Sequence, residues 1–260
     1  MSALAGLCLG QLVVVAAAMS ITALVARRVG RWSVVDVTWG LGFVAIALLW
    51  WVVALRSETG VARASLLLVL VGIWGLRLAW HIGRRSVGHG EDPRYAAIKA
   101  RQPSYVRAAL LPQGIAMFVI SLPIAVSQVF GQARIGWLAW IGVLVWVVGL
   151  LFEAIGDAQL AAYKREPKRR PVMDRGLWRY TRHPNYFGDA CVWWGIWLVA
   201  ADSGIRGAAT VISPIAMTYF LIFATGARLL ERSMMKRPGY PEYAARTSMF
   251  FPLPPKPGTR

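Results

Sequence analysis

The sequence has few cysteines and few histidines, and these scarcities exclude several kinds of site. Cys8 and Cys191 each lie within an apolar run, so they predict neither a disulfide framework nor a paired metal site. The three histidines, His81, His89 and His183, do not have the spacing of metal ligands, and we expect no metal ion. A Gly-x-Gly-x-x-Gly fingerprint is also absent, which argues against a soluble dinucleotide-binding domain.

Hydrophobic residues, in contrast, make up 57% of the 260 residues, and the mean hydropathy is +0.50. Apolar runs of about 20 residues are long enough to cross a bilayer as helices. We therefore predict an all-α integral membrane protein with about seven transmembrane helices in a single membrane domain, residues 1–260. The predicted spans are 3–26, 33–55, 62–83, 108–130, 136–160, 186–202 and 207–230. Residues 1–107 hold the first three spans with the 84–107 loop, and residues 108–260 form the second half.

Acidic residues are scarce as well: 12 Asp and Glu face 29 Lys and Arg, for a net charge of +17. The basic residues cluster in alternate gaps between spans, with three after the first span, six after the third, eight after the fifth and six in the tail. The remaining loops hold only four, so the positive-inside rule predicts an outside N-terminus and a cytosolic C-terminus. This placement suits anionic lipid headgroups as partners, and we expect no nucleic acid.

Polar side chains within the predicted spans gather near the cytosolic end. Asp36, for example, lies one turn into the second span from that side. The others at this depth are Arg77, His81, Arg84, Gln113, Glu153, Asp157, Asn185, Asp189, Arg228, Glu231 and Arg232. We assign Arg63 to an outer loop and expect the outer half to hold only Gln11, Gln128 and hydroxyl groups. A pore would need polar residues in both halves, so this asymmetry predicts a cofactor pocket in the cytosolic half. The alternative is a fringe of side chains that pair at the interface.

One segment, Gly176 to Asp189, reads Gly-Leu-Trp-Arg-Tyr-Thr-Arg-His-Pro-Asn-Tyr-Phe-Gly-Asp. A helix is predicted to begin at Pro184, because proline is tolerated in a first turn and disfavours helix in the residue before it. Asn185 and Asp189 then share one helix face. Three basic side chains precede this start: Arg179, Arg182 and His183. Positive charge beside a helix N-terminus is a good seat for a phosphate group.

The pattern Arg-His-Pro-Asn-Tyr-x-Gly-Asp resembles the C-terminal half of membrane steroid 5α-reductases and of sterol C14 and C7 reductases. Its nearest resemblance is to their bacterial relatives of the DUF1295 type. The resemblance covers the C-terminal part of the chain well and the N-terminal part only loosely. It implies a reductase that transfers hydride from NADPH to a C=C bond, conjugated to a ketone, of a steroid, sterol or isoprenoid-like lipid. Such a lipid-soluble substrate would enter from the bilayer of a bacterial plasma membrane, with the active site facing the cytosol.

The resemblance also implies residues that bind the cofactor. Carried over position by position, these are Arg84, Asp157, Asn185, Tyr186, Asp189 and Arg228. Further candidates in the basic loop, the motif and the last span are Lys164, Arg179, Tyr180, Arg182, His183 and Arg232. Forked arginine side chains suit the pyrophosphate and the 2′-phosphate of NADPH. The residues leave NADH open as the alternative nicotinamide cofactor.

The catalytic residues depart from the steroid 5α-reductase pattern, in which a Glu on the second span and a Tyr on the third polarise the substrate ketone. Here the second span holds Asp36, and the tyrosine register holds His81, with Tyr95 further along the chain. We predict that the proton donor is one of these three residues. Each has a structural alternative: Asp36 can pair with an arginine, His81 can be a packing residue, and residues 91–95 can cap a helix.

Two other functions remain open on the sequence. The shorter Arg-His-Pro-x-Tyr-x-Gly core is similar to isoprenylcysteine carboxyl methyltransferases, which bind S-adenosylmethionine. That cofactor is cationic, so the arginine surplus in residues 164–182 favours NADPH. A non-catalytic lipid-binding membrane protein is the second alternative.

Overall fold

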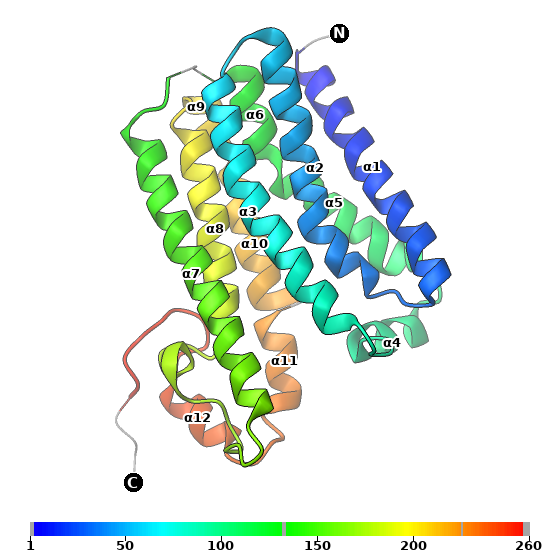
Figure 1. Ribbon diagram of the computed structural model, residues 1–260, viewed down its shortest axis with the longest axis vertical. Helices are drawn as coiled ribbons and strands as arrows, with labels where there is room; N and C mark the ends of the chain where they lie inside the picture. The colour runs from blue at the N-terminus through cyan, green and yellow to red at the C-terminus, as the bar shows by residue number, and fades with distance from the viewer. Residues whose placement is uncertain (1–2, 132–133, 225, 257–260) are drawn as a thin grey trace. The chain divides into compact units, whose positions relative to one another are not determined.

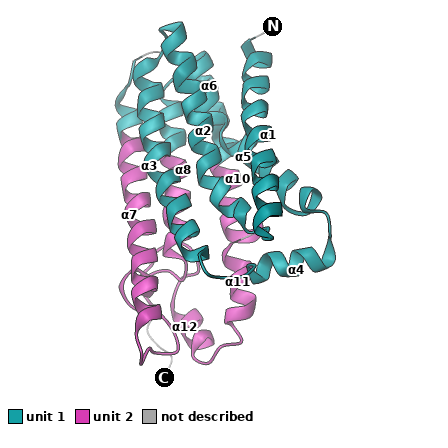
Figure 2. Cartoon of the chain, turned by 45° about the vertical axis from the view of Figure 1, so that its right-hand side comes forward, with its two compact units in different colours: residues 1–140, 196–213 teal, residues 141–195, 214–260 magenta. Residues whose placement is uncertain are grey.

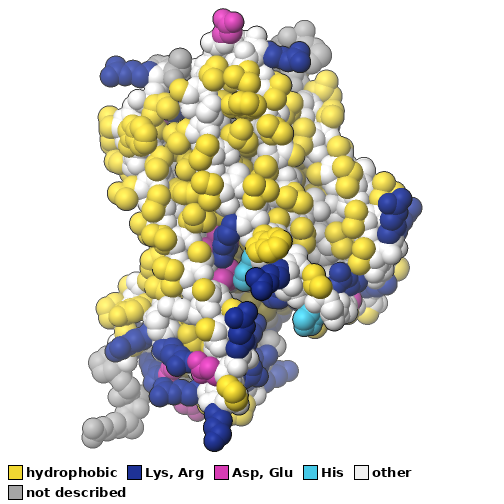
Figure 3. Space-filling view, viewed as in Figure 1, with side chains coloured by type: hydrophobic (Ala, Val, Ile, Leu, Met, Phe, Trp, Pro, Cys, Tyr) yellow, Lys and Arg dark blue, Asp and Glu magenta, His cyan; other side chains and the backbone are white. Residues whose placement is uncertain are grey.

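The computed structural model describes residues 3–131, 134–224 and 226–256, which form helices, loops and one isolated bridge between Thr181 and Ser248 (Figure 1). Six helical segments in these residues are long and apolar enough to cross a membrane: Ala3–Val29, Val34–Ser57, Val61–Ser86, Val106–Phe130, Trp137–Arg165 and Ile205–Met234. On the face shown in Figure 3, apolar side chains cover most of the length of the long helices. The prediction of an all-helical integral membrane protein is confirmed at this level.

Most predicted spans correspond to single helices. These are α1 (Ala3–Val29), α2 (Val34–Ser57), α3 (Val61–Ser86), α7 (Trp137–Arg165) and α8 (Pro184–Ala201). The start of α8 at Pro184 confirms the prediction made from the proline. However, α8 is not among the six apolar segments, and its first turns carry the polar residues Asn185 and Asp189. The predicted number of about seven spans therefore remains a prediction.

The fourth predicted span is interrupted. It consists of a π-helical turn, η1 (Val106–Leu110), followed by α5 (Leu111–Ile120) and α6 (Leu122–Phe130). The break at Ser121 lies two residues before Pro123. Proline has no N–H for the helical ladder and clashes with the preceding turn, so it interrupts the helix here.

The last predicted span, 207–230, is also divided, and its residue 225 lies outside the described residues. Its pieces are α9 (Ile205–Ala208), η3 (Ala209–Val211), α10 (Ile212–Tyr219), the π-helical turn η4 (Phe220–Ala224) and α11 (Ala227–Met234). Short helices outside the predicted spans are α4 (Pro93–Arg101), η2 (Gly176–Arg179) and α12 (Tyr240–Arg246).

The chain divides into two compact units (Figure 2). Unit 1 contains residues 1–140 and 196–213, and unit 2 contains residues 141–195 and 214–260. Within unit 1, α2 and α3 make a close backbone contact at Gly40 and Gly75. A Cβ atom on Gly40 would lie only 2.3 Å from the carbonyl oxygen of Gly75. Small residues allow this approach between helices in a membrane, where packing rather than water drives association.

Within unit 2, α7 and α8 pack along a row of glycines. A Cβ on Gly149 would lie 2.6 Å from the carbonyl oxygen of Gly188, and one on Gly195 would lie 2.5 Å from that of Gly142. The glycines of each helix are spaced seven residues apart, about two helical turns, so they lie on one face. This contact brings the polar residues at the neighbouring ends of α7 and α8 together.

Arg63 is not in a loop, and that prediction is wrong. It lies in the first turn of α3, and its side chain is 1% exposed. Its Nη1 donates to the carbonyl of Val199 at 2.6 Å, and its Nη2 donates to Asp202 Oδ2 at 3.0 Å. The expectation that this half holds only amides and hydroxyls is therefore also wrong: unit 1 contains a buried ion pair at the end of α3 remote from His81. The position of Arg63 beside an apolar run was the sequence feature that could have indicated its burial.

Candidate functional site

Two of the predicted catalytic residues form a hydrogen-bonded pair in unit 1. The hydroxyl of Tyr95, on α4, donates to Asp36 Oδ1 in the first turn of α2. The other carboxylate oxygen, Oδ2, accepts from Arg94 Nη2 at 3.0 Å. Gln113 Nε2 donates to the Tyr95 hydroxyl at 2.9 Å. Four side chains from three helices therefore converge on one phenol and one carboxylate.

Two acidic residues position the pair through the backbone. Asp92 is the N-cap of α4 and accepts from the N–H of Arg94 at 2.8 Å, which fixes the first turn. Glu91 accepts from the N–H of Ser33 at 3.0 Å and from that of Trp32, so it holds the start of α4 beside the start of α2. Two of the structural alternatives are therefore present: residues 91–95 cap a helix, and Asp36 pairs with an arginine. The same cap brings Tyr95 to Asp36.

The electrostatics of this cluster keep the phenol protonated. Burial, and then the nearby Asp36 carboxylate, raise the pKa of Tyr95 above its usual value. Burial opposes the charged form of Asp92, but hydrogen bonds from Arg94 lower the pKa of that carboxyl overall. Tyr95 therefore keeps its proton at neutral pH and acts as a hydrogen-bond donor, while Arg94 keeps a positive charge beside the pair.

In unit 2 the structure brings together a pair of predicted cofactor residues. Asn185 Nδ2, in the first turn of α8, donates to Asp157 Oδ1 on α7 at 3.3 Å. Asp189 lies one turn further along α8 and is 8% exposed, and Glu153 lies one turn before Asp157 and is 3% exposed. The result is a buried polar group at the end of the α7–α8 contact, with carboxylates able to accept from ribose hydroxyl groups or a carboxamide.

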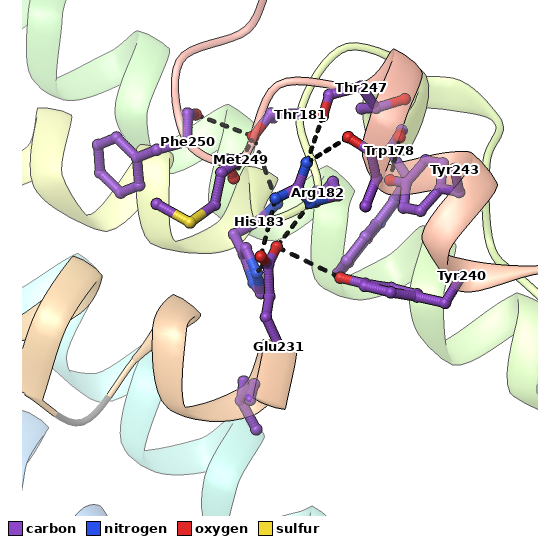
Figure 4. Close-up of polar contacts among 12 residues, drawn as sticks. Trp178, Thr181, Arg182, His183, Glu231, Tyr240, Tyr243, Thr247, Met249 and Phe250 are labelled. Carbon is purple, nitrogen blue, oxygen red and sulfur yellow. Dashed lines mark hydrogen bonds and ion pairs between the residues drawn. The ribbon is translucent and has the colours of Figure 1, made fainter. Parts of the chain in front are cut away.

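The motif's arginine makes a dense set of bonds within unit 2 (Figure 4). Arg182 Nε and Nη2 donate to the two carboxylate oxygens of Glu231 on α11, at 2.6 and 2.8 Å. Its Nη1 donates to the carbonyls of Ala244, at 2.9 Å, and Thr247, at 2.5 Å. Burial disfavours the charge, but Glu231 raises the pKa of Arg182. His183 Nε2 lies 3.2 Å from the same carboxylate, and its ring stacks on Tyr186 at 5.5 Å between centroids.

The C-terminal tail holds the motif in place. The hydroxyl of Thr181 donates to the carbonyl of Phe250 at 2.8 Å (Figure 4). The N–H of Leu253 donates to the carbonyl of Tyr180 at 3.0 Å. Arg182 therefore joins the motif, α11 and the tail. Its predicted role in cofactor binding stays a prediction, and the structure adds a positioning role that the sequence alone did not indicate.

The remaining predicted residues lie mostly on the surface. Exposed side chains are Arg84 on α3, Lys164 at the end of α7, Arg179, Tyr180, and Arg228 and Arg232 on α11. The guanidinium of Arg228 lies 4.5 Å from the centroid of the Phe223 ring. His81 is half-buried on α3.

Comparison with known proteins identifies the family. No curated protein and no solved structure gives a match to this chain. A family model described as "Protein of unknown function (DUF1295)" matches residues 22–247. The match extends through both units and well into the N-terminal part of the chain. This protein therefore belongs to the DUF1295 family.

Proposed function

We propose that this protein is an NADPH-dependent membrane reductase that reduces the C=C bond of an enone in a steroid, sterol or isoprenoid-like lipid. The observation that carries the proposal is the bond between Tyr95 and Asp36. The resemblance described above implies a carboxylate on the second span that works with a tyrosine. The structure of unit 1 places these two side chain types together from positions 59 residues apart.

The residues around Tyr95 suit stabilisation of the charge that develops on the substrate carbonyl in this reaction. Reduction of an enone adds a hydride to the β-carbon and a proton to the α-carbon, with negative charge developing on the carbonyl oxygen. The Tyr95 hydroxyl has a single hydrogen, which it donates to Asp36 Oδ1, so the substrate oxygen would take the place of Asp36 as its acceptor. Gln113 donates to the phenol oxygen and Arg94 holds the Asp36 carboxylate beside it. NADPH would supply the hydride when bound.

The donor set of unit 2 fits a dinucleotide. Asp157 and Asn185 offer an acceptor and an amide at one point, which suits ribose hydroxyl groups. Arg179 and Lys164 are exposed cations able to meet phosphate groups. We further propose that the cofactor site faces the cytosol of a bacterial plasma membrane, as the loop charges predict.

The test uses detergent-purified full-length protein with NADPH and a panel of lipid-soluble enones. Wild type should oxidise NADPH in proportion to the saturated ketone formed. Tyr95→Phe should lower kcat roughly 10²- to 10⁴-fold, the usual contribution of a positioned acid, while NADPH affinity stays within about twofold. Tyr219→Phe, which alters an exposed tyrosine on α10, is the matched control. Equal turnover by both variants would refute the role of Tyr95.

A further inference from the structure

Unit 1 contains a cavity that none of the proposed catalytic or cofactor residues lines. It has a volume of about 460 Å³ and opens at the surface. Its wall is formed by the last turns of α1, by the link to α2, by Lys99 on α4, and by residues 103–106 at the start of the next span. Figures 1 and 2 both show α4 near the end of α1.

The lining is positively charged. Arg27 and Lys99 both line the cavity and are exposed, and none of its ten lining residues is acidic. Within the described part of the chain, neither side chain pairs with a carboxylate. The Glu91 carboxylate accepts from the N–H groups of Trp32 and Ser33 and does not line the cavity. An anion is therefore the ligand that the charges favour.

An aromatic pair closes one side. The rings of Trp32 and Tyr105 stack with centroids 4.9 Å apart, and the ammonium of Lys99 lies 5.7 Å from the centroid of the Trp32 ring. The Tyr105 hydroxyl donates to the carbonyl of Trp32 at 2.8 Å, which fixes the pair. Ser104 adds a hydroxyl to the same wall.

The other side is apolar and lies where two membrane spans end. Ala23 and Ala26, near the end of α1, and Val106, at the start of the following span, line the cavity beside the basic residues. The ends of spans lie at the depth of lipid headgroups, where aromatic and basic side chains collect. A small charged cavity that continues onto an apolar helix surface at this depth matches a ligand with a phosphate group and an acyl chain.

We propose that this cavity binds the headgroup of an anionic phospholipid, with its phosphate between Arg27 and Lys99 and its acyl chain along Ala23. The site is independent of the reductase proposal. A phosphate group also occurs in free phosphate and in a nucleotide, so the experiment must distinguish these sources from the lipid.

The experiment titrates full-length protein, in neutral detergent, with short-chain phosphatidylglycerol, short-chain phosphatidylcholine, inorganic phosphate or NADPH, and measures binding by calorimetry. Wild type should bind phosphatidylglycerol more tightly than phosphatidylcholine. Arg27→Gln and Lys99→Gln should each weaken phosphatidylglycerol binding about fivefold. The matched controls Arg28→Gln and Arg101→Gln remove the same charge from exposed neighbours outside the cavity and should change it less than twofold.

A second variant tests the acyl side. Ala23→Leu narrows the apolar wall but keeps both charges, so it should weaken the lipid and leave any binding of inorganic phosphate unchanged. Equal losses in all four charge variants would show diffuse attraction and overturn the proposal. Binding of NADPH or inorganic phosphate that is lost in Arg27→Gln, without any preference for phosphatidylglycerol, would also overturn it. Melting curves of each variant confirm that the fold is retained.

Discussion

Loss of the buried ion pair between Arg63 and Asp202 should destabilise unit 1 strongly. The two side chains are 1% and 7% exposed, and their nitrogen and oxygen atoms are 3.0 Å apart. Arg63 also donates to the carbonyls of Val199 and Arg134, and Asp202 Oδ2 accepts from the N–H of Gly136 at 2.7 Å. The pair thus joins the start of α3 to the segments before α7 and after α8.

The two halves of the pair should differ in cost. Arg63→Met removes all the guanidinium bonds and leaves a buried carboxylate without its cation, which costs roughly 3–5 kcal/mol. Asp202→Asn can keep both hydrogen bonds, because Arg63 and Gly136 donate to the same oxygen. It loses the negative charge that faces Arg63 and the N–H of Ala139, so about 1.5–3 kcal/mol is expected. In the double variant the two losses should fall short of additivity by about 0.5–3 kcal/mol.

The assay is equilibrium unfolding in mixed micelles, followed by tryptophan fluorescence. Arg56→Met is the matched control, because Arg56 is an exposed arginine at the end of α2 and should cost no more than about 1 kcal/mol. If Arg63→Met were as mild as Arg56→Met, the argument that this arginine is a buried partner of Asp202 would fail.

Three further predictions concern packing, charge and the motif. Gly188→Ala should destabilise the protein by about 1–3 kcal/mol, because its Cβ would lie 2.4 Å from a backbone oxygen. The control Gly72→Ala, whose Cβ would have nothing within 4 Å, should be neutral or stabilising in the same unfolding assay. Acidification should remove the stability that Asp202 contributes. Burial opposes its charge, but bonds from the Gly136 N–H and Arg63 lower its pKa overall, so this stability is present above the unfolded pKa of about 3.9 and is lost as the pH falls below it. Asp202→Asn should flatten this part of the pH profile of stability. Arg179→Gln should weaken NADPH about tenfold more than NADH if it meets the 2′-phosphate, whereas Arg182→Gln should lower stability and weaken both nucleotides alike; identical behaviour of the two variants would contradict this division.

Hydropathy and proline placement predicted much of the fold. Long apolar runs define α1, α2, α3 and α7 because a bilayer leaves a helix as the main way to satisfy the backbone. The start of α8 followed from Pro184 alone. The break at Ser121 had a signal in Pro123, yet a hydropathy window averages over a single residue and does not register it.

The contacts of side chains were harder to predict. The sequence indicated both Asp36 and Tyr95 as candidate proton donors. Their hydrogen bond, however, depends on the tertiary contact that Glu91 makes to the start of α2. Arg63 was assigned by its proximity to a predicted span end, whereas its burial depends on Asp202, which is 139 residues away. Long-range pairing of this kind leaves no local pattern.

A nucleotide titration decides whether this protein is an NADPH-dependent reductase. Full-length protein in detergent is titrated separately with NADPH, NADH and S-adenosylmethionine, and the Asn185→Ala variant is measured beside wild type. We expect saturable NADPH binding that weakens about tenfold or more in Asn185→Ala, because the variant loses the amide that pairs with Asp157. Binding of S-adenosylmethionine without NADPH, or of no nucleotide at all, would contradict it.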